Sequence, residues 1–138
     1  MAKIVTLKAP DGETIYPVTK ASAVDGIIID YSTSEVDTGA TWIDGSHIYK
    51  KTINFGNLPN ATVKNVPHGI SNLNYVIKIE GTAAAPNSTW ITLPVVYRSA
   101  DAAYNVEVST SLTDVVCNTS QDRSMFTAYI TLYYTKTV

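Results

Sequence analysis

Turn-forming residues interrupt this 138-residue chain at short intervals, and the spacing leaves room for strands but not for long helices. These turn signals contain Gly, Pro, Asn and Asp, and they lie at 10–12, 25–26, 44–45, 56–60, 67–69, 85–87 and 118–122. The segments between them are rich in threonine, valine, isoleucine and tyrosine, which favour the half-buried surface of a pleated sheet. The chain is therefore predicted to be all-β, an antiparallel β-sandwich of jelly-roll-like type.

The segment FTAYITLYYTK at 126–136 shows the strand pattern most clearly. One set of alternating positions holds Phe126, Ala128, Ile130, Leu132 and Tyr134, and the other holds Thr127, Tyr129, Thr131 and Tyr133. Successive side chains of a strand point to opposite faces, so the first set is predicted to face the core. The second set is predicted to meet water or another subunit. Further strands are predicted over 42–43, 48–55, 61–66, 75–80, 89–96, 104–108 and 114–118.

The first 30 residues differ from the rest of the chain. Segments 4–8 and 14–18 flank the turn at 10–12 and predict a small N-terminal β-hairpin. Residues 19–25 form at most one helical turn, and the polar stretch 31–41 is interpreted as a junction. We therefore expect an N-terminal attachment segment over 1–30 and a β-sandwich head domain over 31–138.

The composition is that of a globular domain, with 45% hydrophobic residues, 16% charged residues and a net charge of −2. Lysines and arginines are scattered, so no nucleic-acid partner is expected. No apolar run approaches the roughly 20 residues that cross a bilayer, and the start of the chain lacks the apolar segment of a secretion signal. We expect no membrane insertion. The single cysteine, Cys117, lies in an apolar strand context and is predicted to be a buried structural thiol.

Neither histidine predicts a catalytic or metal site. His47 follows the Asp44-Gly45 turn signal of a β-hairpin, and its neighbour Ser46 is not part of a nucleophile motif. His68 lies in a sharp turn before Gly69, where a side chain that hydrogen-bonds the loop backbone is expected. The two histidines are not spaced as metal ligands usually are, so neither a metal nor a cofactor is predicted.

Glycoside hydrolysis would require two opposed carboxyl groups roughly 5 to 10 Å apart across a cleft. The four glutamates are separated in the sequence, and most of the eight aspartates lie in turns. An enzyme is therefore not predicted.

Binding of a sugar needs an aromatic plane and a few polar groups, usually on loops. Two loops provide this combination, and their candidate ligand-binding residues are Trp90, Tyr97, Arg98, Asp101 and Tyr104 in the first and Asp122 and Arg123 in the second. A structural interpretation competes with this one. Trp90 and Tyr97 alternate with core residues and could pack inside the sandwich, and Asp122 with Arg123 could form an ion pair in a turn.

Four motifs follow one another from Tyr31 onward and span roughly four-fifths of the chain: YSTSEVDTGATWIDGSHIYKKTINFGNLPN (31–60), VPHGISNLNYVIKIEG (66–81), TWITLPVVY (89–97) and DRSMFTAYITLYYTKT (122–137). Their order resembles the C-terminal head domain of bacteriophage tail-fibre and receptor-binding proteins. The stretch TLKAPDGETIYPVTKASAV (6–24) resembles the opening of phage tail or appendage proteins. The resemblance implies a β-sandwich head in a homotrimer that recognises a bacterial surface glycan or protein. It also implies that the N-terminus attaches to other virion tail proteins.

These expectations place the protein in a phage virion, after synthesis in the host bacterial cytoplasm. Trp42, Tyr129 and Tyr133 provide more aromatic surface than a small monomer usually exposes, so they are the predicted subunit interface. Two other functions stay open from the sequence. One is a purely structural virion appendage, such as a head fibre or a baseplate decoration, and the other is a small glycan-cleaving enzyme.

Overall fold

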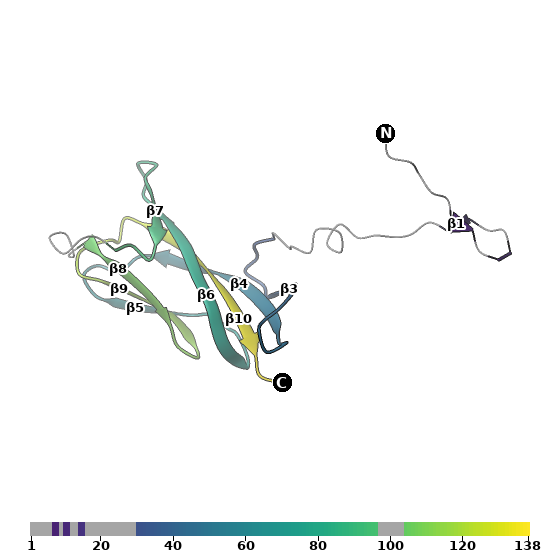
Figure 1. Ribbon diagram of the computed structural model, residues 1–138. Helices are drawn as coiled ribbons and strands as arrows, with labels where there is room; N and C mark the ends of the chain where they lie inside the picture. The colour runs from purple at the N-terminus through teal and green to yellow at the C-terminus, as the bar shows by residue number, and fades with distance from the viewer. Residues whose placement is uncertain (1–6, 9, 12–13, 16–29, 97–103) are drawn as a thin grey trace.

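The computed structural model describes residues 7–8, 10–11, 14–15, 30–96 and 104–138. Residues 30–96 and 104–138 form two antiparallel sheets that pack face to face, which confirms the predicted β-sandwich (Figure 1). No helix in the described ranges is long and apolar enough to cross a membrane. The predicted helical turn at 19–25 lies outside the described residues.

The larger sheet has five strands and the smaller sheet three. In spatial order the larger sheet consists of β3 (Val36–Thr41), β4 (His47–Asn57), β10 (Thr127–Lys136), β6 (Leu73–Ala84) and β7 (Trp90–Leu93). The smaller sheet consists of β5 (Val63–Pro67), β9 (Asp114–Thr119) and β8 (Val106–Thr110). A separate two-stranded pairing of β1 (Leu7–Lys8) with β2 (Thr14–Ile15) forms the predicted N-terminal hairpin.

β10 is the central strand of the larger sheet and carries the middle of the core. Ala128, Ile130, Leu132 and Tyr134 are fully buried on its inner face. They pack in one cluster with Ile53 and Phe55 of β4 and with Val115 and Cys117 of β9. The alternation of β10 thus has the predicted orientation, because one side of the strand faces the smaller sheet. The cluster also confirms Cys117 as a buried thiol.

The segment 36–41 was predicted to be part of a polar junction, and this prediction is wrong. It forms β3, an edge strand that pairs with β4 through Val36 opposite Lys50 and Asp37 opposite Tyr49. An edge strand is paired on one side and is largely exposed here, so it needs no apolar alternation. Its polar sequence therefore gave no strand signal.

The predicted hairpin around Asp44-Gly45 is present, but residues 42–43 belong to the turn rather than to a strand. The Gly45 amide donates to the Trp42 carbonyl over 2.9 Å, and the Ser46 amide donates to the Asp44 carboxylate over 2.9 Å. Gly45 has a φ of 84°, a conformation that glycine adopts without steric cost. The Asp-Gly pair is thus explained by the turn geometry.

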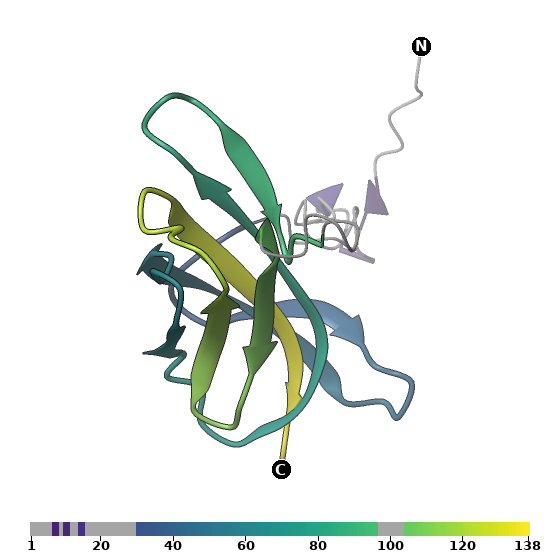
Figure 2. The same cartoon turned by 90° about the vertical axis from the view of Figure 1, so that its left-hand side faces the viewer.

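The hairpin between β6 and β7 extends beyond the end of the sandwich, as Figures 1 and 2 show. Its strands pair from Gly81 opposite Leu93 to Ala84 opposite Trp90. Leu93 is buried and Ile91 packs against the core, so the alternating residues Trp90 and Thr92 face away from it. This register places Trp90 on the same sheet face as Tyr129 of β10.

Candidate functional site

The face of the five-stranded sheet that points away from the smaller sheet, called the outer face here, carries the best candidate site. β10 contributes Tyr129, Thr131 and Tyr133 to this face, because they alternate with the buried core residues. Thr131 pairs with Thr52 of β4 on one side and with Glu80 of β6 on the other. Side chains from three adjacent strands therefore meet on one surface.

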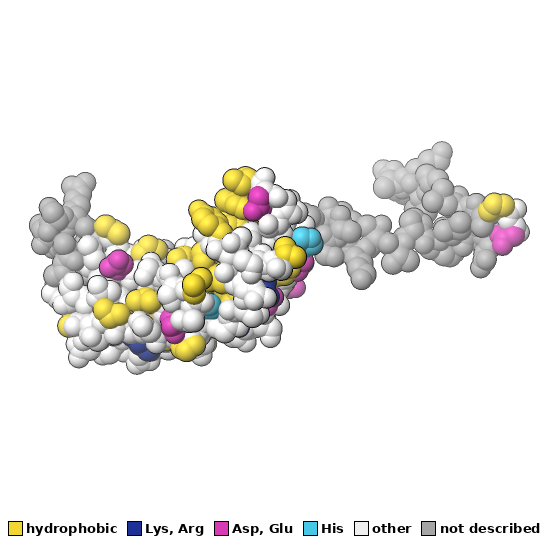
Figure 3. All heavy atoms as spheres, turned by 90° about the horizontal axis from the view of Figure 1, so that it is seen from below, with side chains coloured by type: hydrophobic (Ala, Val, Ile, Leu, Met, Phe, Trp, Pro, Cys, Tyr) yellow, Lys and Arg dark blue, Asp and Glu magenta, His cyan; other side chains and the backbone are white. Residues whose placement is uncertain are grey.

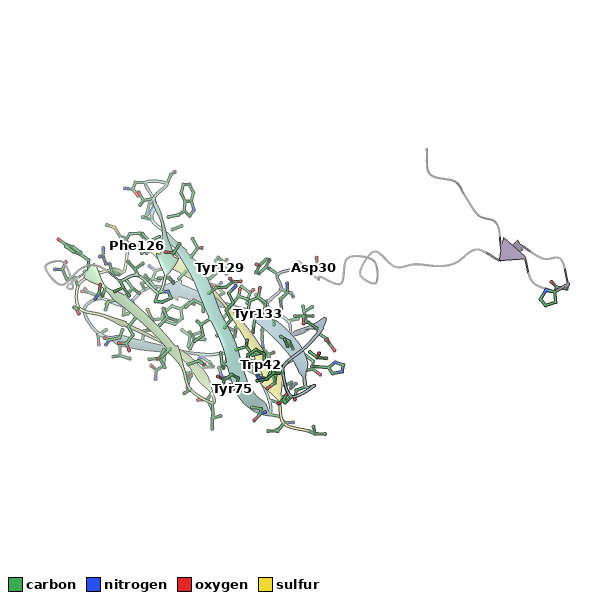
Figure 4. The ribbon with its side chains drawn as sticks, in the orientation of Figure 1. Asp30, Trp42, Tyr75, Phe126, Tyr129 and Tyr133 are labelled. Atoms are coloured by element: carbon green, nitrogen blue, oxygen red, sulfur yellow. The ribbon has the colours of Figure 1, made fainter. Side chains whose placement is uncertain are left out.

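A groove of about 580 Å³ lies on the outer face. It is lined by Tyr31, Ser32, Thr33, Thr52, Glu80, Gly81, Thr82, Tyr129 and Thr131. Tyr31 and Tyr129 are 61% and 53% exposed, so both rings are accessible from solvent. Figure 4 shows Tyr129 and Tyr133 along the same sheet. This groove combines aromatic rings, hydroxyl groups and one carboxylate.

The segment before β3 forms one wall of the groove. The Thr52 amide donates to the Ser32 carbonyl over 2.8 Å, which continues the sheet edge beyond β3. The Tyr31 ring extends from this edge over the outer face. Lys50 Nζ lies 4.5 Å from the ring centroid, and the Tyr31 hydroxyl donates to Glu80 Oε1 over 3.5 Å. Lys50 is only 2% exposed beneath it.

Hydroxyl groups form the floor of the groove. Thr52 Oγ1 and Thr131 Oγ1 are 2.8 Å apart and share a hydrogen bond. Thr131 is 5% exposed, whereas Thr82 beside it is exposed. A threonine hydroxyl both donates and accepts, so this floor suits a ligand that carries hydroxyl groups.

Glu80 is the charged centre of the site. Lys78 Nζ lies 2.8 Å from Glu80 Oε2, and the Tyr133 hydroxyl donates to Glu80 Oε1 over 3.0 Å. The hydrogen bond from Lys78 lowers the pKa of the Glu80 carboxyl, partial burial opposes this effect, and the hydroxyls of Tyr133 and Tyr31 reinforce it. Burial and the bonds to Tyr31 and Glu80 raise the pKa of Tyr133. At neutral pH the cluster thus holds an ionised carboxylate and a neutral phenol.

The loop residues that the sequence suggested as ligand contacts separate into different environments. Trp90 is 66% exposed, so packing inside the sandwich is excluded for this residue. Arg123 Nη2 donates to the Tyr104 carbonyl over 3.0 Å, and the guanidinium carbon lies 5.0 Å from the centroid of the Tyr104 ring. Arg123 therefore joins two loops. Tyr97, Arg98 and Asp101 lie outside the described residues.

Asp122 has a local structural role. Its Oδ1 accepts hydrogen bonds from the Ser124 amide over 2.9 Å and from the Ser124 hydroxyl over 2.6 Å. These bonds lower the pKa of the Asp122 carboxyl. The suggested ion pair with Arg123 is not formed in this described turn, because the carboxylate is directed at Ser124.

The predicted interface residues Trp42, Tyr129 and Tyr133 lie along the larger sheet in Figure 4. Trp42 stacks on Tyr75 with ring centroids 5.9 Å apart and planes inclined by 24°. Tyr133 is partly buried and hydrogen-bonded to Glu80, whereas Tyr129 is more exposed. Tyr129 is thus the most accessible of the three phenol or indole side chains.

The two histidines have structural partners. His68 is 2% exposed, its Nδ1 accepts from the Ile70 amide over 3.0 Å, and its Nε2 lies 3.3 Å from the Ser111 carbonyl. This confirms the predicted bond to the loop backbone. His47 Nδ1 lies 2.9 Å from Asp37 Oδ2 at an exposed position of the β3–β4 pair. Within the described ranges, no group of three or more His, Cys, Asp or Glu is placed to hold a metal ion.

Sequence reasoning did not find Tyr31, Thr52, Glu80 and Thr131 as a site. The Thr and Tyr alternation of β10 did indicate a polar outer face for Thr131. Glu80 gave no signal because an outward charge on a strand is ordinary, and two of its partners, Tyr31 and Tyr133, come from distant segments. Pairing between non-neighbouring strands is what brings these residues together.

No protein-family model, curated protein or solved structure matches this chain. The geometry of the outer face and the motif order described above are therefore the two observations on which a function can be based.

Proposed function

We propose that this protein is a non-enzymatic receptor-binding protein of a bacteriophage tail, and that it recognises a glycan on the bacterial surface. The observation that carries the proposal is the groove on the outer face, in which the exposed rings of Tyr31 and Tyr129 flank threonine hydroxyls and the Glu80 carboxylate. The motif order from Tyr31 to the C-terminus, which resembles tail-fibre heads, supplies the biological setting.

The groove has the chemistry that sugar binding requires. An aromatic ring covers the apolar C–H face of a sugar, and fixed polar groups bond its hydroxyls. Glu80 is held by Lys78 and Tyr133, so its carboxylate is already oriented before a ligand arrives. Preorganised groups lose little conformational entropy on binding.

The same groove is unsuited to glycoside hydrolysis. Glu80 is the single carboxylate among the lining residues, and its pKa is lowered rather than raised, so it is a poor proton donor at neutral pH. A second carboxylate across the groove would be needed for either hydrolytic mechanism. A reducing-end assay on host cell-wall polysaccharide is expected to show no product, and released sugar ends would contradict the non-enzymatic proposal.

The binding proposal is tested with an array of bacterial surface glycans and with whole-cell binding by the full chain. We expect defined glycan signals that Tyr129→Ala weakens about tenfold or more, the loss typical of an anchoring aromatic residue. Leu112→Ala is the control, because Leu112 is 71% exposed in the turn between β8 and β9 of the smaller sheet. Absence of binding to both glycans and cells would favour a purely structural virion appendage instead.

We further propose that the protein is a homotrimer, since several weak glycan contacts gain strength when they are linked. Light scattering is expected to give about 45 kDa, three times the 14.9 kDa of one chain. The predicted subunit contact through Trp42, Tyr129 and Tyr133 shares Tyr129 with the groove. If Tyr129→Ala dissociates the trimer, this face is a subunit interface, and if only glycan binding is lost, it is the receptor site.

A further inference from the structure

The outer face carries more aromatic surface than the groove itself contains. Trp90 pairs with Ala84, which pairs with Thr127, so this tryptophan lies near the first residue of β10. Tyr75 pairs with Thr135 near the other end of the same strand. Trp90 is 66% exposed and Tyr75 is 55% exposed, and Tyr129 lies between them along the strand direction.

Trp90, Tyr129 and Tyr75 form a line of rings, called the aromatic row here. The row is long compared with a single sugar ring. Thr127 and Thr135 are eight positions apart on β10, which corresponds to about 27 Å at the usual rise of a strand. Tyr75 is itself supported by Trp42, which stacks on it. The row therefore has the length for several consecutive sugar units, and the stacking of Trp42 supports the ring at the Tyr75 end.

Hydroxyl groups lie between the rings. Thr82 pairs with Thr92 and with Tyr129, so both threonines share the outer face with the tyrosine, and both are exposed. With Thr52 and Thr131 they form a band of donors and acceptors beside the row. A polysaccharide presents C–H faces and hydroxyl groups in alternation, and such a ligand fits this surface.

The charges on this face disfavour an acidic ligand. The described residues that line the groove include one carboxylate, Glu80, and neither lysine nor arginine. Two lysines lie nearby, but Lys78 is paired with Glu80 over 2.8 Å and Lys50 is shielded beneath the Tyr31 ring. The Lys78 side chain is 58% exposed, but its ammonium is already paired with Glu80. The lining residues therefore supply no cation of their own for a phosphate or uronate group, and such a group would lie beside the Glu80 carboxylate.

We propose that the outer face binds an extended, uncharged polysaccharide segment along β10, with sugar rings on Trp90, Tyr129 and Tyr75. The inference rests on the proposed function, because it names the ligand class of the same groove. It differs from recognition of a single terminal sugar, for which Trp90 and Tyr75 would be irrelevant. It also excludes phosphate-bearing wall polymers as the preferred ligand.

Affinity electrophoresis of the full chain tests the ligand class. Gels contain dextran, mannan or galactan as uncharged polymers, and alginate or wall teichoic acid as acidic ones. We expect retardation by at least one uncharged polymer and no comparable retardation by the acidic polymers. Preference for an acidic polymer, or no retardation by any of them, overturns the inference. If the protein still binds a glycan of the array in that case, the proposed function stands and only the class of glycan changes. If it binds whole cells but no glycan, the glycan part of the proposed function fails as well.

Calorimetry with size-fractionated oligosaccharides of the retarding polymer tests the extended mode. Affinity is expected to rise at least about tenfold from the monosaccharide to the longest fragment, and Trp90→Ala or Tyr75→Ala should remove about tenfold for long fragments only. Leu112→Ala serves as the control, and circular dichroism checks that each variant is folded. Affinity that is independent of length and of both end variants overturns the inference. Dissociation of a trimer by Tyr129→Ala would also overturn the inference, because a second copy of the chain would then cover the outer face.

Discussion

The hydroxyl of Tyr134 donates a 2.6 Å hydrogen bond to Oε2 of Glu35, a residue 99 positions earlier in the chain. Tyr134 is fully buried on β10, and Glu35 directly precedes β3, so this bond ties the edge of the larger sheet to its centre. Lys136 Nζ lies 2.9 Å from the other carboxylate oxygen. The segment that carries Tyr31, which forms one wall of the groove, is thus anchored at Glu35.

This link predicts a stability loss in acid. Burial raises the pKa of Glu35, but hydrogen bonds from Tyr134 and Lys136 and the charges of Lys136 and Lys51 outweigh it, so the pKa lies below its ordinary value of 4.5. A carboxyl with a lowered folded-state pKa stabilises the fold above its unfolded pKa, and this contribution is lost as the pH falls through the folded pKa. Melting temperatures measured from neutral pH down to below 4 should fall.

Glu35→Gln separates this effect from the titration of other carboxyls. The variant should melt lower than the parent at neutral pH, by the equivalent of about 1 kcal/mol, because a charge-assisted bond to the buried hydroxyl becomes a neutral one. Between neutral pH and acid, the melting temperature of the variant should fall less than that of the parent protein. Identical pH profiles for both proteins would disprove the role of Glu35.

His68 is predicted to stabilise the loop before β6. His68→Ala would leave the Ile70 amide and the Ser111 carbonyl without their side-chain partner and would open a cavity, at a cost of about 2–4 kcal/mol. His68→Asn is the matched control, because its side-chain oxygen can replace Nδ1 as the acceptor for Ile70. Urea unfolding should place the Asn variant between the parent and the Ala variant. Equal stability of all three would contradict the assignment.

Cys117 is predicted to be unreactive in the folded protein. The residue is fully buried, and burial raises the pKa of its thiol to about 11 in spite of the nearby Lys64 charge. The thiolate is the reactive form, so both access and ionisation are limited. A disulfide reagent should titrate almost no thiol in the native protein and one thiol per chain in denaturing guanidinium. Rapid modification of native protein would show that the smaller sheet opens readily.

Gly81 is predicted to tolerate no side chain. A Cβ at this position would stand 2.8 Å from the backbone oxygen of Tyr129 and 3.1 Å from Ile130 Cγ1, so β6 and β10 could not keep their present separation. Gly81→Ala should cost about 1–3 kcal/mol, as overpacking in a core does. Thr82→Ala, one position away with an exposed side chain, is the control for thermal unfolding. A Gly81→Ala variant as stable as this control would contradict the close approach.

Several features of the fold were predictable because they depend on local patterns. The alternation in 126–136 identified the buried side of β10, and the turn around His68 indicated a backbone-bonded side chain. β3 was missed because an exposed edge strand carries no apolar alternation. Packing of Trp90 in the core was a competing interpretation that proved wrong, because β7 turns this residue to the outer face.

The sequence by itself determined the division into short strands and turns, and it determined which side of β10 is buried. Both follow from turn chemistry and from the two-residue period of a strand, which act between neighbours in the chain. Only the tertiary structure decided that Tyr31, Thr52, Glu80 and Tyr129 line one groove. The reason is that sheet order and register are set by pairing between distant segments, and no local pattern specifies which strand will lie beside β10.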